Sequence, residues 1–257
     1  WPASLHVIGK DILRFHAIYW PAFLLAAGIE PPNRVFGHGW ILSGDEKMSK
    51  SKGNILNPLE IIDKYGIDEL RYYLMKEVSH GSDGSISLNS LEKCINSDLA
   101  NNYGNLCQRI FSFVKNNCKN KVDRTKKISD EDKKLIKETK ALTGDLRNLM
   151  NNQDLNNYIK SVINISFLTN KYINDEEPWK LKKNNIEKMN NILHLSLEQI
   201  AKISILLNPI IPIATTKVLE ALKINVKSKN LSFLDGKNLI SNKIKVSELN
   251  ILFKKIN

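Results

Sequence analysis

Residues 44–54 read GDEKMSKSKGN, a polar run that follows an apolar, strand-like segment and precedes a clearly signalled helix. Within it, two lysines and two serines on the short loop Lys47–Ser51 can close around a polyanion such as a nucleotide triphosphate. Composition alone favours an ordinary solvated loop, because lysine and serine are common on protein surfaces. The position favours a ligand site, since open α/β folds place ligands at strand-to-helix junctions.

Length and composition indicate a soluble chain with one sizeable core or two modest ones. The 257 residues are 42% hydrophobic and 25% charged. No apolar run approaches the roughly 20 residues of a membrane span, and the N-terminus has no basic region ahead of an apolar one. Cys94, Cys107 and Cys118 lie too far apart for a metal knuckle or a redox dithiol, which predicts buried thiols in a reducing compartment. We therefore expect a cytoplasmic protein with no membrane contact.

The positive charge lies in the C-terminal part of the chain. The whole sequence carries a net charge of +11. Up to Ile95 there are 10 Lys and Arg against 11 Asp and Glu, which leaves 28 against 16 for the remainder, a net of +12. Two interpretations stay open, a generally basic and asparagine-rich composition with solvated lysines, or a surface that faces a polyanion such as nucleic acid.

The first 54 residues have the pattern of a parallel α/β domain. Residues 5–9 form a short apolar run typical of a buried strand, and Asp11 is expected to cap a helix that Pro21 kinks or restarts. A second strand is predicted over residues 35–42, with glycines where backbone approaches a neighbour or ligand. Two strands cannot make a stable open sheet with both faces covered. We expect the first half of this domain to be missing here or to be supplied by another chain.

From residue 57 onward the helical period dominates. Asn57-Pro58 is a helix start, Asp68 is expected to cap the next helix, and residues 81–87 form a turn-rich break. Further helices are predicted over residues 88–118, 130–150, 154–172 and 186–207, with a last one ending at Leu222. Short connections make these a helical bundle. The tail after residue 223 is expected to pack back, because its Ile-Leu-Phe cluster would be a liability if exposed.

The run at residues 44–54 closely resembles the second signature of class I aminoacyl-tRNA synthetases. FGHG at 36–39 precedes it, and the pattern YGxDxxRY at 65–72 follows it. Within that class, four further stretches in the same order resemble the methionyl-tRNA synthetase family: GKDIxxFH at 9–16 with WPA at 20–22, DGSIS at 83–87, NLxxR at 105–109, and PW at 178–179. The resemblance covers the chain from Leu5 to about Leu222 and is weak in the tail.

The resemblance implies a fold and a division of the chain. The fold class is an α/β remnant, the second half of a Rossmann-like parallel sheet domain, followed by an all-α helical bundle. Residues 1–54 would hold the C-terminal part of the catalytic domain with the signature loop, and residues 55–95 a stem-contact region. Residues 96–222 would form the anticodon-binding bundle, and residues 223–257 the tail that packs back on it.

The resemblance also implies two small-molecule sites. Lys47 and Lys50 would be catalytic, because their charges can lie over the β and γ phosphates of ATP as charge develops there. ATP contacts are further expected from Gly9, Asp11, His38, Ile41, Ser49 and Ser51. Ile12 and His16, four apart on one helix face, would line the methionine pocket. The residues alone allow other roles. Asp11 could simply cap a helix, His38 could be a core histidine with its hydrogen bonds made inside the protein, and His16 could lie at the boundary between core and surface.

Asn105, Arg109 and Trp179 are the anticodon readers that the resemblance implies. Asn105 and Arg109 lie four apart on one helix face, and an amide with a guanidinium can read the base edges of an unstacked loop. Trp179 follows Pro178 at a helix start, where an indole can stack on a base. Without the resemblance, the first two are an ordinary polar helix flank and the tryptophan is packing.

The resemblance therefore implies part of an enzyme that uses ATP with Mg²⁺ to form methionyl adenylate and transfers the methionyl group to tRNA(Met). The family's first signature, His-Ile-Gly-His, and its zinc-binding insertion do not occur here, and no metal ligands are predicted. A non-catalytic tRNA-binding module is the alternative, as are the isoleucine, valine, leucine and cysteine enzymes of the same class. We expect this chain to bind tRNA and to fail to activate methionine. No oligomer is implied.

Overall fold

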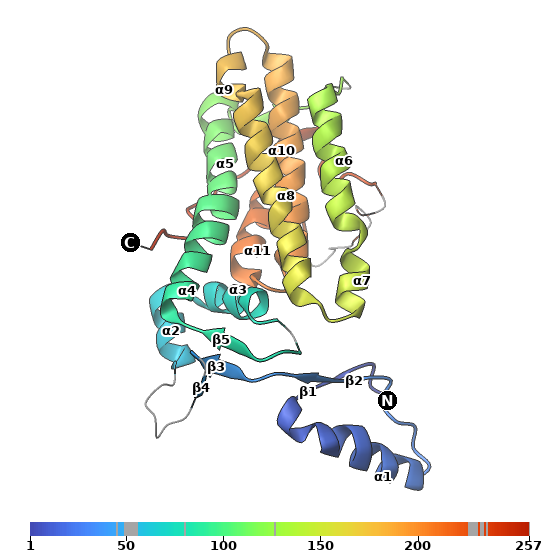
Figure 1. The fold of residues 1–257 in the computed structure, drawn as a ribbon. Helices are drawn as coiled ribbons and strands as arrows, with labels where there is room; N and C mark the ends of the chain where they lie inside the picture. The colour runs from blue at the N-terminus through green and yellow to red at the C-terminus, as the bar shows by residue number, and fades with distance from the viewer. Residues whose placement is uncertain are drawn as a thin grey trace.

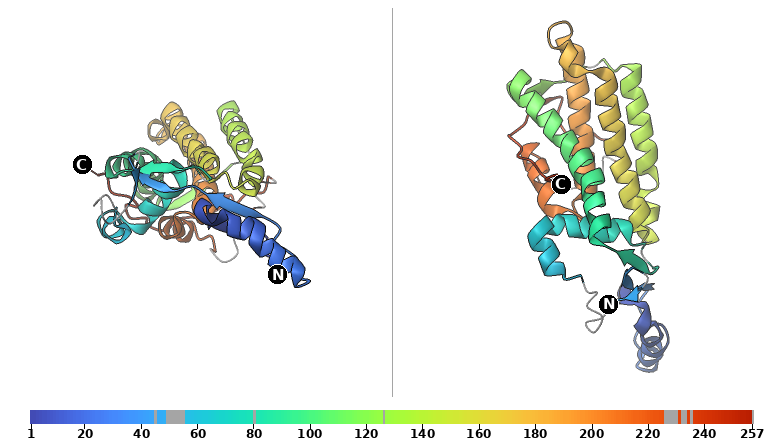
Figure 2. Two further views of the ribbon diagram at one scale, coloured as in Figure 1. Left: turned by 60° about the horizontal axis from the view of Figure 1, so that its bottom comes forward. Right: turned by 60° about the vertical axis from the view of Figure 1, so that its left-hand side comes forward.

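The fold is elongated, with the β1–β2 and β4–β3–β5 sheets at one end and a helical bundle extending to the other (Figures 1 and 2). The structure is a computed structural model, and it describes residues 1–44, 46–48, 56–79, 81–125, 127–225, 231, 234 and 236–256, with only the backbone of residues 46 and 47. Helices that are distant in sequence run side by side along the bundle, while the N-terminal strands and helix α1 lie beyond its base (Figure 1).

The N-terminal α/β segment is a parallel strand pair with one helical crossover. β1 (His6–Gly9) pairs with β2 (Val35–His38), so that His6 lies opposite Val35 and Gly9 opposite His38. The crossover holds a 3-10 turn (Lys10–Ile12), a π-helical stretch (Phe15–Tyr19) and α1 (Trp20–Ala26), with Pro21 in the first turn of α1. The prediction that Asp11 caps a helix is wrong. Asp11 lies inside the 3-10 turn, because the strand passes directly into that turn, and its side chain makes no cap.

The predicted strand over residues 35–42 is two strands in two sheets. After β2, the chain passes through Gly39 into β3 (Ile41–Ser43), which pairs in parallel with β5 (Gly84–Ile86) and antiparallel with β4 (Glu46–Lys47). A Cβ atom at Gly39 would lie 2.1 Å from the carbonyl carbon of Ser82. Only glycine permits this approach of two backbone segments, which confirms the expectation for this residue.

Helices α2 (Pro58–Tyr65) and α3 (Ile67–Glu77) follow, and the first starts as predicted. The Asn57 side chain accepts a hydrogen bond from the Leu59 N–H at 3.0 Å, and proline takes the first helical position. The next prediction is wrong, because α3 starts at Ile67 and Asp68 does not cap it. The Asp68 carboxylate instead accepts from the backbone of α11 (Pro212–Ala221), 146 positions away.

The predicted helix over residues 88–118 is continuous but not uniform. It comprises α4 (Leu88–Cys94), a π-helical stretch (Ile95–Gly104) and α5 (Asn105–Cys118). The buried Tyr103 hydroxyl lies 2.7 Å from the Ser204 hydroxyl, which joins this run to the central helix of the bundle.

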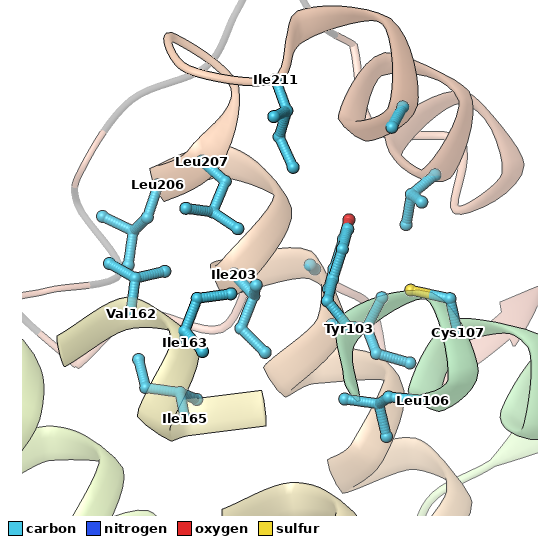
Figure 3. Packing of buried hydrophobic residues seen from close by; sticks show 14 of the residues in the cluster. Tyr103, Leu106, Cys107, Val162, Ile163, Ile165, Ile203, Leu206, Leu207 and Ile211 are labelled. Atoms are coloured by element: carbon cyan, nitrogen blue, oxygen red, sulfur yellow. The ribbon is translucent and has the colours of Figure 1, made fainter. Parts of the chain in front are cut away.

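The rest of the bundle consists of α6 (Asp130–Gly144), α7 (Leu146–Asn151), α8 (Leu155–Glu176), α9 (Pro178–Leu181) and α10 (Ile186–Leu207). The helix predicted over 130–150 is interrupted at Asp145, and α8 runs past Tyr172 to Glu176. α10 has its predicted bounds and is buried along almost its whole length, so it forms the centre of the core. In the view of Figure 3, Ile203 of α10 lies between Tyr103 and Leu106 on one side and Val162 and Ile163 of α8 on the other.

The C-terminal tail returns along the bundle. β7 (Lys243–Lys245) pairs antiparallel with β6 (Lys121–Asp123), and the buried Phe253 ring packs on Tyr103 with centroids 6.5 Å apart. The three cysteines are free thiols, and burial raises the pKa of Cys94 to about 12. Across the described ranges, no helix is both long enough and apolar enough to cross a lipid bilayer.

Candidate functional site

Three of the residues predicted to contact ATP meet at one edge of the β1–β2 sheet. Gly9 and His38 are paired neighbours at the carboxyl ends of the two strands. The Asp11 carboxylate turns back over Gly9, since a Cβ there would lie 2.5 Å from Asp11 Oδ1. The His38 ring donates from Nδ1 to the Gly39 carbonyl at 2.9 Å. Parallel sheets bind ligands at this edge, where the backbone of Gly9 is accessible beside an exposed carboxylate.

The signature loop begins from this same region. Ile41 starts β3 three residues after His38, with 41% of its surface exposed. Lys47 ends β4 and is paired with Leu42 across the turn. The side chain of Lys47 and the residues Ser49, Lys50 and Ser51 lie outside the described residues, so the predictions for them stay predictions.

The two residues predicted to bind methionine share one helical turn. The His16 ring donates from Nδ1 to the Ile12 carbonyl at 3.0 Å. His16 lines an open groove of about 760 Å³ whose other walls are mostly aromatic and aliphatic, whereas Ile12 is exposed outside it. The walls of the groove include Trp1, Leu5, Phe15, Tyr19, Trp20 and Phe23. Most of this face is open, with Phe15 at 58% and Phe23 at 66% exposed.

A charged contact that the sequence analysis did not assign ties this region to the next sheet. Lys10 Nζ lies 2.6 Å from the carboxylate of Asp83 and 4.3 Å above the Trp40 ring. The Trp40 N–H donates to Asp83 Oδ1 at 2.8 Å. The Lys10 hydrogen bond and the Trp40 N–H hold the pKa of Asp83 below its ordinary value. Asp83 opens the DGSIS stretch, but its partner lies 73 positions away, so no local signal reveals the contact.

Arg109 and Trp179 meet at the other end of the molecule. The Arg109 guanidinium lies 5.8 Å from the centroid of the Trp179 ring, and its Nη2 donates to Asn174 Oδ1 at 2.7 Å. Both residues line a cavity of about 340 Å³, and Trp179 is 42% exposed. Glu177 takes a left-handed conformation that ends α8, and Pro178 starts α9, so the chain reverses and presents the indole beside α5.

Asn105 lies one turn before Arg109, exposed at the start of α5, and does not line that cavity. The structure therefore brings together two of the three predicted anticodon residues and leaves the third at some remove along the same helix. Asn174 and Asn170, which sequence reasoning missed, hold the guanidinium at 2.7 and 3.5 Å. Their spacing of four on α8 places them on one face, the sole local sign of this role.

This arrangement suits the recognition of an unpaired base. An exposed indole offers a flat face for stacking, and a guanidinium fixed by side-chain amides retains donors for a base edge or a phosphate. A metal site is not formed by the described residues, which contain no group of three or more His, Cys, Asp or Glu side chains placed to hold an ion.

Comparison with known families gives two adjoining matches. Residues 2–111 match the family model of class I tRNA synthetases (M), and residues 122–257 match the anticodon binding domain of methionyl tRNA ligase. The methionine-tRNA ligase of Rhizobium meliloti is 40% identical over 234 residues, which is 91% of this chain and 45% of that protein. The corresponding ligase of Rickettsia felis is 42% identical over 232 residues, 89% of this chain and 45% of its own.

Solved structures agree with these matches. The Mycobacterium tuberculosis methionyl-tRNA synthetase bound by methionyl-adenylate superposes with a TM-score of 0.91 at 34% identity, over 99% of this chain and 50% of that one. A second structure of the same protein with methionyl-adenylate gives a TM-score of 0.92 at 35% identity. The chain spans about half the length of the curated relatives it matches. The predicted fold class, a parallel-sheet remnant followed by a helical bundle, is confirmed.

Proposed function

Because the chain belongs to the class I methionyl-tRNA synthetase family, we propose that it is the part of a methionine-tRNA ligase that carries the signature loop and the anticodon-binding bundle. The whole reaction has two steps. Methionine attacks the α phosphorus of ATP to give methionyl adenylate and pyrophosphate, and the methionyl group then passes to the terminal ribose of tRNA(Met). The division at residues 54, 95 and 222 belongs to this proposal.

In this proposal the sheet edge holds the nucleotide. The Gly9 backbone approaches the adenosine, and the Asp11 carboxylate accepts hydrogen bonds from ribose hydroxyls. His38 and Ile41 flank the base, while His16 and Ile12 border the methionine. Lys47 and Lys50 place positive charge where it develops on the departing phosphates, and Ser49 and Ser51 supply donors in the same loop. Mg²⁺ would balance the charge of the phosphates when bound, and no described residues form a site for it.

The observation that carries the tRNA-binding part is the Arg109–Trp179 pair. It lies at the end of the bundle that carries α9, while the β1–β2 edge lies beyond the opposite end (Figure 1). A tRNA also presents its anticodon and its acceptor end at opposite extremes. One chain can therefore contact both if the tRNA lies along the bundle.

The test of this part is anticodon discrimination by the 257 residues. We expect tighter binding of a tRNA with the CAU anticodon than of the same tRNA altered in that triplet. Trp179→Ala should weaken binding of the CAU tRNA by about 1–3 kcal/mol, the value of one base stacked on an aromatic ring. Phe167→Ala is the matched control, because Phe167 is an aromatic side chain of α8 that is 48% exposed and does not line the cavity. Equal discrimination by the parent and by Trp179→Ala would contradict the assignment.

The exposed apolar face beside His16 supports the need for a further half-domain. Phe15, Ile18 and Phe23 are each more than half exposed, and the β1–β2 sheet has two strands in the described part of the chain. An apolar face of this kind marks a protein interaction surface. We infer that it is covered by the N-terminal half of a class I catalytic domain, on the same polypeptide or on another. The alternative is a tRNA-binding module without catalysis.

Pyrophosphate exchange with methionine separates these alternatives. The 257 residues alone should show no exchange. Adding the separately produced N-terminal half of a methionyl-tRNA synthetase should restore it, and Phe23→Asp should prevent restoration by placing a charge on the apolar face. Robust exchange without the added half would refute the need for it. No exchange after addition, with binding of the two halves demonstrated, would favour the non-catalytic module.

A further inference from the structure

The two-stranded ribbon β6–β7 has one buried face and one basic face. Val122 and Ile244 lie opposite each other and point into the bundle, 0% and 7% exposed. The residues on either side of them therefore point outward. On that outer face Lys121 lies directly opposite Lys245, and Asp123 lies opposite Lys243, all four exposed. We call these four residues the basic ribbon face.

This pairing is not explained by the stability of the fold. Like charges directly opposite on one face of an antiparallel pair repel each other and destabilise the ribbon. Among the described residues, none of Lys121, Lys243 and Lys245 forms an ion pair, whereas nearby Lys115 pairs with Glu248 at 2.6 Å. A bound polyanion would relieve this repulsion, because its negative charges would lie between the positive charges of the lysines.

The basic ribbon face is close to the Arg109–Trp179 cavity. β6 begins three residues after α5 ends, and α5 carries Arg109. On the other side, Leu193 of α10 lines the cavity, and the next residue, His194, donates from Nε2 to the carbonyl of Ser241 at 2.9 Å, two residues before β7. The ribbon and the cavity are therefore separated by about the width of one or two helices, roughly 10–20 Å.

We propose that the basic ribbon face binds the phosphate backbone of the RNA whose unpaired bases are read at Arg109 and Trp179. The proposal rests on the proposed function, since it takes the RNA to be a tRNA. Contacts to phosphates fix the position and register of a nucleic acid, whereas contacts to base edges and faces specify its sequence. The basic ribbon face thus holds the stem adjoining the loop, and the cavity discriminates the loop.

The experiment measures the affinity for CAU tRNA between 50 and 300 mM KCl, concentrations chosen to span the range where phosphate contacts are screened. The variant is Lys121→Gln with Lys245→Gln. Each lost phosphate contact lowers the slope of log affinity against log salt by about 0.7–0.9, so the double variant should lose about 1.4–1.8. Its affinity at 100 mM should fall by about tenfold or more.

Two control pairs keep the result specific. Lys134→Gln with Lys137→Gln removes the same charge from the exposed side of α6 and should leave most of the slope intact. Lys121→Arg with Lys245→Arg keeps the charge and should keep the slope. The ratio of affinities for CAU and altered anticodons should be unchanged in every pair. The thermal midpoint of Lys121→Gln with Lys245→Gln should be unchanged or raised, since repulsion is removed.

An unchanged slope in Lys121→Gln with Lys245→Gln would overturn the proposal, as would an equal loss in the α6 pair. Failure of the proposed function gives a different result. In that case the parent itself would not discriminate between CAU and altered anticodons, whatever the slopes of the lysine variants.

Discussion

Replacing Asp68 tests how helix α3 holds the start of helix α11. Asp68 is 4% exposed, and its carboxylate accepts from the Ala214 N–H at 2.7 Å and the Ile213 N–H at 3.4 Å. Both N–H groups lie in the first turn of α11, where the helix itself offers them no acceptor. The cap position of α11, Ile211, has no side-chain acceptor either. Asp68 therefore acts as a helix cap supplied by another helix.

The cost of removing this cap follows from those two bonds. The bond to Ala214 is short and joins a carboxylate to a helix N-terminus, so its loss costs about 1.5–3 kcal/mol, while the long bond to Ile213 adds little. We expect Asp68→Ala to lower the free energy of unfolding by about 2–3 kcal/mol. Asp68→Asn keeps one acceptor oxygen and loses the charge, so it should cost about 1 kcal/mol.

Urea unfolding followed by far-ultraviolet circular dichroism measures these values. Asp63→Ala, on the exposed side of α2, is the matched control and should stay within about 0.5 kcal/mol of the parent. A change within the same limit for Asp68→Ala would show that the carboxylate does not stabilise the start of α11. The cap assignment also fails if Asp68→Asn costs as much as Asp68→Ala, because the accepting oxygen would then contribute nothing.

Two further predictions concern stability. Burial raises the pKa of Glu69 from its ordinary value of 4.5 to about 7, so the folded state holds this proton more tightly and loses stability as pH rises through that range. Relative to Glu69→Gln, the parent should lose about 1–2 kcal/mol between pH 5 and 8 in urea titrations, allowing for solvent screening, and no pH dependence of the difference would contradict this. Gly39→Ala forces a Cβ to within 2.1 Å of the Ser82 backbone and should cost about 1–3 kcal/mol in thermal melts. Gly144→Ala meets no atom within 4 Å and should stabilise by up to about 1 kcal/mol; equal effects of the two substitutions would contradict the close approach at Gly39.

Helices of the bundle were predictable because their signals are local. α10 has its predicted bounds, since apolar residues recur at intervals of three and four and Pro209 follows its end. α2 likewise begins at the predicted Asn57-Pro58. The helix predicted over 130–150 was wrong at Asp145, where the chain breaks into α6 and α7 although the apolar period continues. The spacing of apolar residues cannot reveal a break between two helices when the same spacing continues across the break.

The candidate sites were predictable in part, through resemblance and not through local physics. The pairing of Gly9 with His38 joins residues 29 positions apart, and the Arg109–Trp179 contact joins residues 70 apart. Each of these residues, taken alone, has an ordinary structural explanation. A binding role is suggested only by their proximity to one another in the folded chain. Asn174 carried only the weak signal of its four-residue spacing from Asn170, because asparagines on a helix flank are usually solvated.

Local patterns in the sequence were enough to predict the class of each segment, the bundle of amphipathic helices and the polar run at 44–54, because these depend on periods and residue types within one window. Tertiary structure alone decided that residues 35–42 divide between two sheets at Gly39, and that Asp68 caps α11 rather than its own helix. It also decided that Lys121 stands opposite Lys245. The physical reason is the same in all three cases: hydrogen bonds and charges between strands and helices are fixed by neighbours that lie far away in sequence.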